Sequence, residues 1–440
     1  MVYLLILPNN FRKRNMSKII ITILFITALQ FRIDAQSFNS YFTEGSLRID
    51  YIHTANEKNE IFSLDSYYHE PFWGGSEINL IDTFEYGHYK YEVYDSTTST
   101  LIYSRGYSTL CGEWRFTNEA KTYWRSFSES LIMPFPKKTI NVKVFKREKD
   151  QSWTLWSDLT INPNDYNIIP QQKTKIKSFK IHNSGKPSDK LDIVLLAEGY
   201  TQQEMQKFMK DAERFKNSLL SWSPLNKYKD KINVWAVPTS SEESGTDIPG
   251  KNIYKNTLFD SHFYTFGTER YINTVNNKAI RDAAANVPYD QIYVLVNTDK
   301  YGGAGIYNFY SICTADNENS EFVFNHEFGH AFAGLADEYY TSDVGVEDFY
   351  DLEAEPWEPN ITTMVDFNKK WKNMINENTP IPTPDTKDYE ETIGVFEGAG
   401  YVEKKVFRPR HDCSMKSIKS DYFCPVCSKA FIDMLNFYSK

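Results

Sequence analysis

The sequence predicts an α+β protein in which an N-terminal antiparallel β-sandwich, residues 37–170, precedes an α/β domain, residues 180–440. Up to about residue 170 the chain is rich in Tyr, Phe, Trp and Thr, and apolar residues recur at every second position. From about residue 180, short buried strands alternate with stretches of helical periodicity. The length of 440 residues also exceeds what one domain usually needs. These observations together indicate two domains.

The first 36 residues have the pattern of a secretory signal peptide. A basic start at Met16 and Lys18 precedes an apolar run, residues 19–29, and small residues follow shortly after it. The run is shorter than the roughly 20 residues of a membrane-spanning helix. We therefore expect translation to begin at Met16. The mature protein is expected to be exported to the periplasm, the cell surface or the exterior, and not to span a membrane.

The N-terminal sandwich is predicted from strands in which apolar and polar residues alternate. The clearest strands carry apolar residues at Tyr89, Tyr91 and Val93, at Ile140, Val142 and Val144, and at Trp153 and Leu155. Polar residues 162–178 are the expected linker to the second domain. We expect the aromatic side chains to fill the core of the sandwich, and the alternative is that they stack on glycans.

The α/β fold of the second domain is predicted from buried strands that are separated by helical stretches. Strands are expected at residues 193–197, 232–237 and 292–296, and Thr201 is expected to cap a helix that runs to about Leu220. A glycine-rich turn at residues 302–305 leads into a strand at residues 306–313. An extended peptide can pair with a sheet edge, and this turn and strand are the candidates for that role. The insertion at residues 341–410 is expected to shape a cleft.

The pentapeptide His326-Glu327-Phe328-Gly329-His330 carries the strongest chemical signal. On a helix, residues i and i+4 lie one above the other, so both imidazoles can reach one metal ion. Glu327 can then take a proton from a metal-bound water. The flanking residues are apolar, which predicts a buried helix that ends near Gly334. Hydrolysis of a peptide bond with one catalytic Zn²⁺ is therefore the first hypothesis.

The third metal ligand is specified less directly. A metzincin zinc site has a third histidine ten residues after the first, but Ala336 occupies that position here. Asp337, eleven residues after His326, is the favoured ligand, because catalytic zinc takes three protein ligands and one water. Glu338 is the alternative beside it. Further candidates are His411, Glu353, Glu390 and Glu397.

Two smaller features accompany the pentapeptide. Gly329 lowers helix stability by about 1 kcal/mol relative to Ala, so we expect another backbone to pack against it. The run HDCSMK, residues 411–416, fits a Met-turn, in which a buried methionine lies beneath the metal. Met415 is therefore predicted to form an apolar floor and not to bind the metal.

The runs HEFGHAFAGLADEYY, CSMKS and FCPVCSKAF together resemble the immunoglobulin A peptidase family of metzincin-like bacterial zinc metallopeptidases. The resemblance extends back to residues 191–201 and covers about residues 180–440. It implies a metzincin-like endopeptidase domain with His326, His330 and Asp337 as zinc ligands. Glu327 would be the general base, and Met415 would lie in the Met-turn. The implied substrate is a protein or glycoprotein whose identity the resemblance leaves open.

Other expectations concern the reaction and its partners. Zinc and Tyr422, which follows the Met-turn, are the candidates to stabilise the oxyanion. A net charge of -9, with no basic run in the mature chain, argues against a nucleic-acid partner, and we expect a monomer. One alternative function is an exported, non-catalytic protein that binds glycans or proteins and has a structural metal site. Another is a metal-dependent amidase acting on cell-wall peptides.

The five cysteines are too few for a disulfide scaffold in a chain of this length. Cys413 is expected to pair with Cys424 or Cys427, which would tie the Met-turn to a C-terminal helix beginning near Pro425. A second zinc site built from these three thiols is the alternative. Cys111 is expected to be an ordinary buried thiol, and the alternative is an inhibitory thiol on the zinc.

Overall fold

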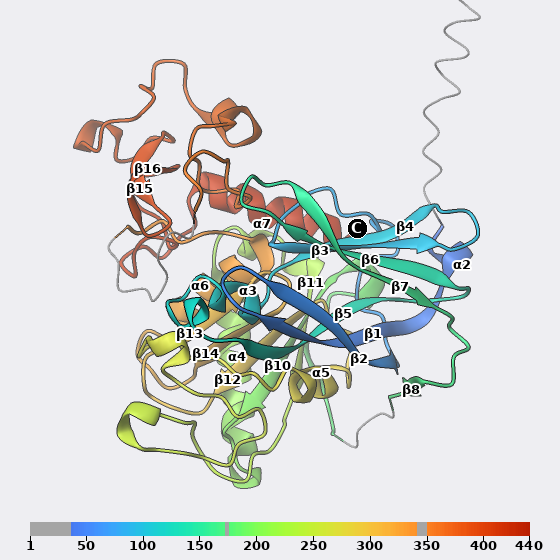
Figure 1. The fold of residues 1–440 in the computed structure, drawn as a ribbon. Coiled ribbons are helices and arrows are strands. Elements are labelled where there is room, and N and C mark those ends of the chain that lie inside the picture. The colour runs from blue at the N-terminus through green and yellow to red at the C-terminus, as the bar shows by residue number, and fades with distance from the viewer. Residues whose placement is uncertain (1–36, 172–175, 341–349) are drawn as a thin grey trace, which may run out of the picture.

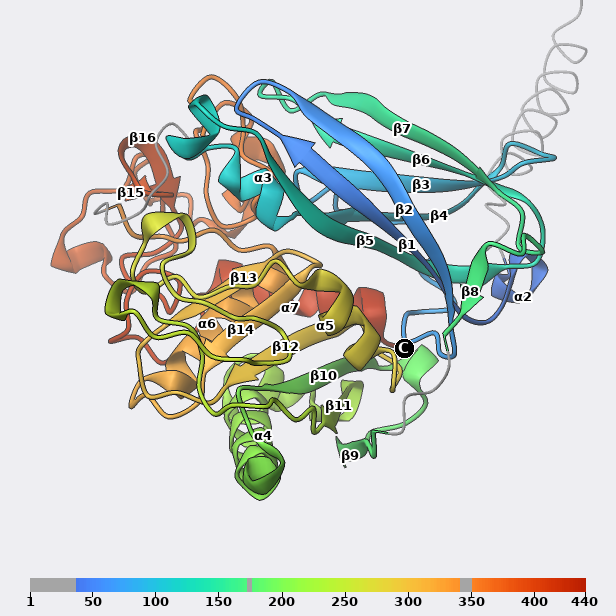
Figure 2. The same cartoon turned by 60° about the horizontal axis from the view of Figure 1, so that its bottom comes forward.

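The computed structural model describes residues 37–171, 176–340 and 350–440, and the predicted signal peptide lies outside these ranges. The described chain is a mixed α/β structure with several sheets and a separate N-terminal domain, as Figures 1 and 2 show. The N-terminal domain lies over one face of the sheet that carries the second domain.

The N-terminal domain contains two four-stranded sheets, with strand orders β5-β1-β2-β8 and β4-β3-β6-β7. Its elements are α2 (Phe38–Tyr41), β1 (Phe42–Ala55), β2 (Glu60–Glu70), β3 (Tyr89–Asp95), β4 (Leu101–Tyr107), α3 (Leu110–Trp114), η1 (Glu119–Lys121), β5 (Arg125–Pro136), β6 (Ile140–Arg147), β7 (Trp153–Ile161) and β8 (Ile168–Pro170). All the pairings are antiparallel except the short parallel pairing of β2 with β8. The predicted linker therefore contains a strand, because β8 lies inside residues 162–178.

Aromatic residues of these strands form one buried cluster that both sheets share. In β3 and β6 the buried and partly exposed positions alternate, as the sequence predicts. Tyr51, Tyr89, Tyr91, Tyr103 and Tyr107 are each at most 4% exposed. Rings buried to this extent cannot stack on a glycan, so the core interpretation of these tyrosines is the correct one.

The second domain is built on a six-stranded sheet of order β13-β14-β12-β10-β11-β9. The strands are β9 (Phe179–His182), β10 (Leu191–Glu198), β11 (Ile232–Val237), β12 (Gln291–Val296), β13 (Gly303–Ile306) and β14 (Tyr310–Thr314). The four central strands run parallel, and β9 and β13 pair antiparallel at the two edges. The predicted strands at residues 193–197, 232–237 and 292–296 are confirmed. The glycine-rich segment itself forms the edge strand β13.

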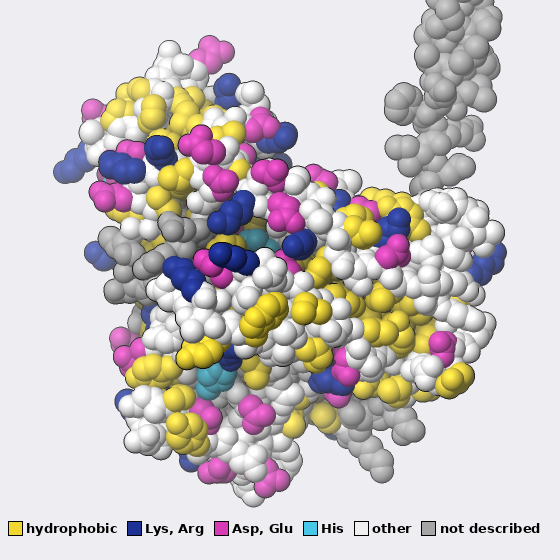
Figure 3. All heavy atoms as spheres, viewed as in Figure 1, with side chains coloured by type: hydrophobic (Ala, Val, Ile, Leu, Met, Phe, Trp, Pro, Cys, Tyr) yellow, Lys and Arg dark blue, Asp and Glu magenta, His cyan; other side chains and the backbone are white. Residues whose placement is uncertain are grey.

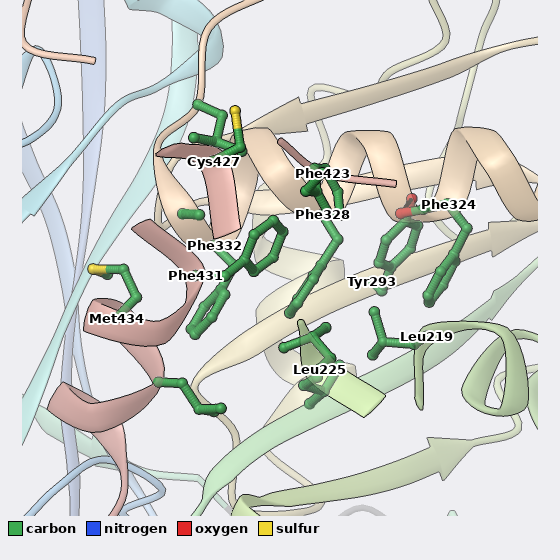
Figure 4. Close-up of a cluster of buried hydrophobic side chains, with 14 of the residues drawn as sticks. Leu219, Leu225, Tyr293, Phe324, Phe328, Phe332, Phe423, Cys427, Phe431 and Met434 are labelled. Atoms are coloured by element: carbon green, nitrogen blue, oxygen red, sulfur yellow. Dashed lines mark hydrogen bonds between the residues drawn. The ribbon is translucent and has the colours of Figure 1, made fainter. Parts of the chain in front are cut away.

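Helices cover the two faces of this sheet differently. The helices are η2 (Pro187–Asp189), η3 (Gln202–Glu204), α4 (Met205–Ser221), η4 (Leu225–Lys227), η5 (Lys229–Lys231), η6 (Pro249–Lys251), η7 (Thr265–Gly267), α5 (Asn277–Ala284), α6 (Ser320–Ala333) and α7 (Pro425–Tyr438). Helices α4, α6 and α7 share a core with one face, and Figure 4 shows Phe324, Phe328 and Phe431 in it. The other face packs on α5 and on the N-terminal domain through Leu110 and Trp114.

Helix boundaries follow the predicted local signals. Thr201 and Glu204 form a capping box, in which the Thr201 N–H donates to Glu204 Oε2 over 2.9 Å. Helix α7 begins at Pro425, as predicted, since a proline at the first helical position leaves no unpaired N–H.

Residues 350–410 form a lobe beside the C-terminal end of α6 (Figure 1). The lobe contains η8 (Phe367–Lys369), η9 (Lys372–Met374), η10 (Lys387–Tyr389) and the antiparallel pair β15 (Phe396–Ala399) and β16 (Val402–Arg408). Trp371 and Phe396 are buried, so the lobe has its own apolar contacts. On the face drawn in Figure 3, basic and acidic side chains are interspersed and the surface is hollowed beneath this lobe.

Asp192 in β10 should make the free energy of unfolding depend on pH. Its carboxylate accepts hydrogen bonds from Trp235 Nε1 at 2.6 Å and Asn233 Nδ2 at 3.3 Å, but burial outweighs them and raises its pKa to about 6. The unfolded chain loses this proton at lower pH, so the free energy of unfolding should fall as pH rises from about 4 to about 6. Asp192→Asn should remove about 3 kcal/mol of that fall. Thermal unfolding midpoints across this range check it, and parallel profiles for both proteins would contradict it.

Candidate metal centre

Helix α6 ends where the sequence predicts, and its end turns the chain back toward the histidines. Gly334 follows the last helical residue with a left-handed φ of 64°, a conformation that glycine adopts without strain. Its N–H donates to the carbonyl of His330 over 3.1 Å, and the Leu335 N–H donates to the carbonyl of Gly329 over 3.2 Å. This cap brings the following residues, including Asp337, alongside the last turn of the helix.

The side chain of Met415 packs against Gly329. A Cβ at position 329 would lie 2.9 Å from Met415 Sδ, and Met415 is fully buried. The prediction that another backbone would pack there is wrong, because the methionine sulfur occupies that space. The position of Met415 beneath the helix is the one that a Met-turn residue would take.

Edge strand β13 lies against the opposite side of the helix. A Cβ at Gly305 would lie 2.1 Å from the carbonyl oxygen of Glu327, and one at Gly303 would lie 2.9 Å from Glu327 Oε1. A side chain at either position would push the strand away from the helix. The two glycines therefore allow this edge strand, which Tyr271 bridges at Gly303, to pass directly beside the Glu327 carboxylate.

His326, His330 and Asp337 converge on one point. The two Nε2 atoms are 3.1 Å apart, and Asp337 Oδ1 lies 3.1 Å from His326 Nε2 and 3.3 Å from His330 Nε2. The outer nitrogens of both rings face backbone carbonyls, with His326 Nδ1 2.9 Å from Ser414 O and His330 Nδ1 2.6 Å from Leu335 O. Because a carbonyl only accepts, Nδ1 carries the proton in each ring, and the neutral ring presents a lone pair at Nε2.

Three acceptor atoms that face one another fit a bound cation. A tetrahedral zinc with bonds of 2.0–2.1 Å holds neighbouring ligand atoms about 3.3 Å apart, close to the three distances observed. Asp337 Oδ1 is buried and has no hydrogen-bond partner. Protons on both Nε2 atoms would place two cationic rings side by side, whereas one divalent cation satisfies all three atoms. The residues present therefore fit a zinc ion.

Electrostatics at the site follow from burial and from this carboxylate. Burial disfavours a charged imidazole, yet the Asp337 carboxylate outweighs it and raises the pKa of His330 to about 9. Burial also disfavours the ionised form of Asp337, but the two histidines hold its pKa well below the ordinary range. Without a bound cation, His330 is therefore protonated and Asp337 ionised, and a bound zinc ion would replace the proton at Nε2.

The other candidate ligands lie elsewhere. The Glu338 side chain points away from the histidines, where Oε1 accepts from Asn360 Nδ2 at 3.0 Å. His411 pairs with Asp385 at 2.9 Å. Glu353, Glu390 and Glu397 are exposed. None of these five residues lines the cavity described below.

Contacts from the lobe hold Asp337 in place. The Tyr401 hydroxyl donates to Asp337 Oδ2, and the Gly400 N–H donates to the Asp337 carbonyl over 2.9 Å. Asn360 forms hydrogen bonds with Ala336, the residue before Asp337. Its Oδ1 accepts from the Ala336 N–H at 2.8 Å, and its Nδ2 donates to the Ala336 carbonyl at 2.9 Å. The lobe at residues 350–410 therefore orients the third candidate ligand.

A cavity of about 640 Å³ opens over these residues. Its lining includes the metal-ligand candidates, Glu327, strand β13, Arg270, Tyr301 and Tyr339. The carboxylate of Glu327 lies within 4.8 Å of the ring nitrogens of both histidines. Burial raises the pKa of Glu327, against the opposing effect of the two histidines. A carboxylate with a raised pKa, beside the three candidate ligand atoms, is suited to accept and return a proton.

The N-terminal domain contributes residues to the lining of this cavity. The sequence did not indicate that contribution. Glu113 in α3 lines the cavity, together with His88 and Ser108. The Tyr271 hydroxyl donates to Glu113, and burial raises the pKa of Glu113 to about 7 despite this bond. No motif surrounds Glu113 in the sequence, so only the docking of the two domains brings it here.

The predicted oxyanion donor Tyr422 and the alternative zinc thiol Cys111 both lie outside the cavity, and the predicted disulfide does not form. The Tyr422 hydroxyl donates to the carbonyl of Asp412 at 3.3 Å, and Tyr422 is not in the cavity lining. Cys111 is fully buried and its thiol faces the carbonyl of His53 at 3.8 Å, which fits an ordinary buried thiol. The predicted disulfide of Cys413 is absent, because all five cysteines are free thiols.

Comparison with protein families agrees with this geometry. A family model described as IgA peptidase M64 matches residues 179–392 and 386–435, and a model of the M64 N-terminus matches residues 37–157. The chain belongs to the IgA peptidase M64 family. The resemblance stated from the sequence is thereby confirmed, and the chain is a peptidase of a metallopeptidase family, with proteins as its substrate class. No curated protein matches the chain.

Within the described ranges, no helix combines the length and the apolar character needed to cross a membrane.

Proposed function

We propose that this M64 chain is an exported zinc-dependent endopeptidase that cleaves proteins or glycoproteins. The convergence of His326 Nε2, His330 Nε2 and Asp337 Oδ1 beside the Glu327 carboxylate carries the proposal. Three protein ligands leave one position open for water, as in catalytic zinc sites. Zinc bound there would lower the pKa of its water towards about 7 and polarise the scissile carbonyl.

The residues of the chain then divide the remaining work. Glu327 takes the proton from the attacking water and returns it to the leaving amine. The carbonyls of Ser414 and Leu335 hold the two imidazoles in the tautomer that presents Nε2. Arg270, Tyr301 and Tyr339 in the cavity wall offer donors to the substrate oxyanion, and they replace Tyr422 in that proposed role.

Substrate alignment is assigned to β13. This edge strand lines the cavity and passes beside the Glu327 carboxylate. A substrate in extended conformation could add to the outer edge of this strand beyond Gly303, where Tyr271 forms an isolated bridge, and bring a peptide bond next to the proton acceptor. The proposal includes a metzincin-like catalytic fold, an N-terminal β-sandwich and export through the predicted signal peptide.

The function is tested by incubating purified protein with folded glycoproteins and identifying new N-termini by mass spectrometry. Parallel incubations contain a zinc chelator, or the chelator followed by excess zinc. We expect new internal N-termini that disappear with the chelator and return with zinc. Cleavage that the chelator leaves unchanged would refute zinc dependence. Release of fragments from cell-wall peptides alone would favour the amidase.

Tyr401 gives a prediction about positioning. Tyr401→Phe removes the hydrogen bond to Asp337 Oδ2, and loss of such an outer contact typically costs about 10–100-fold in metal affinity or activity. Zinc affinity and peptide cleavage should both fall by that amount. Tyr422→Phe is the matched control, because its hydroxyl bonds a backbone carbonyl outside the cavity. A larger loss of cleavage in Tyr422→Phe would restore Tyr422 as the oxyanion donor.

A further inference from the structure

A second group of metal-ligating side chains lies behind the first. Cys413, Cys424, Cys427 and Glu338 place one ligand atom each within 4.8 Å of one another, and all four residues are fully buried. They come from the segment before Met415, from the start of α7 and from the chain after α6. Figure 4 shows Cys427 on α7 at the margin of the buried apolar cluster.

The distances fit coordination and do not fit a disulfide. Cys413 Sγ and Cys427 Sγ are 3.8 Å apart, and a tetrahedral zinc with bonds of about 2.3 Å to sulfur holds two sulfurs about 3.8 Å apart. A disulfide needs about 2.05 Å between its sulfurs. Cys427 Sγ also lies 3.1 Å from Glu338 Oε1, which places the carboxylate in the same group.

The buried carboxyl group of Glu338 has no cationic partner in an ion pair among the described residues. Its Oε2 is buried without a hydrogen-bond partner, and no described Lys, Arg or His forms an ion pair with it. A buried carboxylate normally has a cation or several donors around it. A metal ion shared with the thiols would supply that cation.

Two features around the thiols would stabilise sulfur bound to a metal ion. The N–H of Cys424 donates to Cys413 Sγ over 3.2 Å, and such donors stabilise a metal-bound sulfur. Cys424 and Cys427 flank the first turn of α7, whose exposed N–H groups favour negative charge. Three thiolates and one carboxylate in a closed, buried group suit Zn²⁺.

We propose that Cys413, Cys424, Cys427 and Glu338 bind a second, structural zinc ion. Its ligands lie next to those of the candidate catalytic centre, since Glu338 follows Asp337 and Cys413 precedes Ser414, whose carbonyl accepts from His326. The Glu338 N–H also donates to the Met415 carbonyl over 2.8 Å. The ion would thereby join α7, the Met415 segment and the chain after α6 into one frame behind the first site.

The wild-type protein supports a decisive first experiment. The first site offers only nitrogen and oxygen ligands, and the remaining described group, His53, Cys111 and Glu129, offers one sulfur. A zinc ion with two or three sulfur neighbours can therefore come only from the second site. We expect about two zinc ions per chain by elemental analysis and a sulfur shell at about 2.3 Å by X-ray absorption. Zinc with nitrogen and oxygen neighbours alone would overturn the proposal. An intact mass lowered by two hydrogens, the sign of a disulfide among the three thiols, would also overturn it.

Variants separate the two sites. The double variant His326→Ala/His330→Ala removes the first site and should keep one zinc per chain with a larger share of sulfur neighbours. Adding Cys427→Ser should remove that zinc, whereas adding Cys313→Ser, a buried thiol outside the group, should leave it. Absence of zinc from the double variant would refute the second site. Because cleavage is not the readout, this result is independent of the proposed peptidase mechanism.

Discussion

Glu327→Ala should lower the rate of peptide-bond cleavage by about 10²–10⁴-fold while leaving the zinc content unchanged. The carboxylate lies within 4.8 Å of both histidine ring nitrogens, and burial raises its pKa. In the proposed reaction it moves a proton twice, from water and then to the leaving amine. Its loss removes that transfer but none of the three ligand atoms. Cleavage of a fluorogenic peptide and elemental analysis measure the two effects separately.

The control for Glu327 is a carboxylate on the same helix. Glu321 lies in the first turn of α6 and forms an exposed ion pair with Arg214 at 3.4 Å. Glu321→Ala removes a surface interaction worth at most about 1 kcal/mol and should keep full activity. Retention of most of the cleavage by Glu327→Ala, with zinc bound, would rule out Glu327 as the general base.

Asp337→Ala should abolish binding of the zinc that has only nitrogen and oxygen ligands, and cleavage with it. Loss of an outer contact to a metal ligand already costs about 10–100-fold, so loss of the ligand itself should weaken this zinc by more than 100-fold. Asp337 Oδ1 lies 3.1 and 3.3 Å from the two histidine nitrogens, and it is the charged member of the trio. Titration with zinc under a competing chelator measures the affinity, and peptide cleavage measures the activity.

Asp337→Asn and Asp366→Ala sharpen this comparison. Asn keeps an oxygen in nearly the same place but removes the negative charge, so it should bind zinc more weakly than Asp and more tightly than Ala. Asp366 is a partly exposed carboxylate of the lobe that pairs with Lys369 at 2.8 Å, and its removal should change neither affinity nor rate. Wild-type zinc affinity in Asp337→Ala would show that another residue is the third ligand.

Local signals in the sequence were sufficient for much of the fold. The period-two alternation of Tyr89, Tyr91 and Val93 and the apolar runs of the central sheet are each explained by burial of one or both faces of a strand. The ends of helices are equally local. Gly334 stops α6 because it adopts a left-handed conformation, and Pro425 starts α7 because it needs no partner for an N–H.

The arrangement of the candidate metal site depended instead on contacts between segments that are far apart in the chain. Asp337 and Glu338 are adjacent carboxylates in a segment without helical periodicity, so no pattern shows which faces the histidines. Asn360 and the hairpin residue Gly400 fix the path of that segment through backbone hydrogen bonds. The group that packs against Gly329 is likewise distant in sequence: it is the sulfur of Met415, in the segment that follows the lobe.

By itself, the sequence determined that His326 and His330 lie on one face of a helix, because their spacing of four residues is close to one helical turn. It also determined that Glu327 would accompany them. Only the tertiary structure decided which carboxylate faces the two histidines, where Glu113 lies in the cavity, and how Glu338 groups with three unbridged thiols. The physical reason is that periodicity reports which face of an element is buried, whereas ligand geometry depends on where separate elements meet.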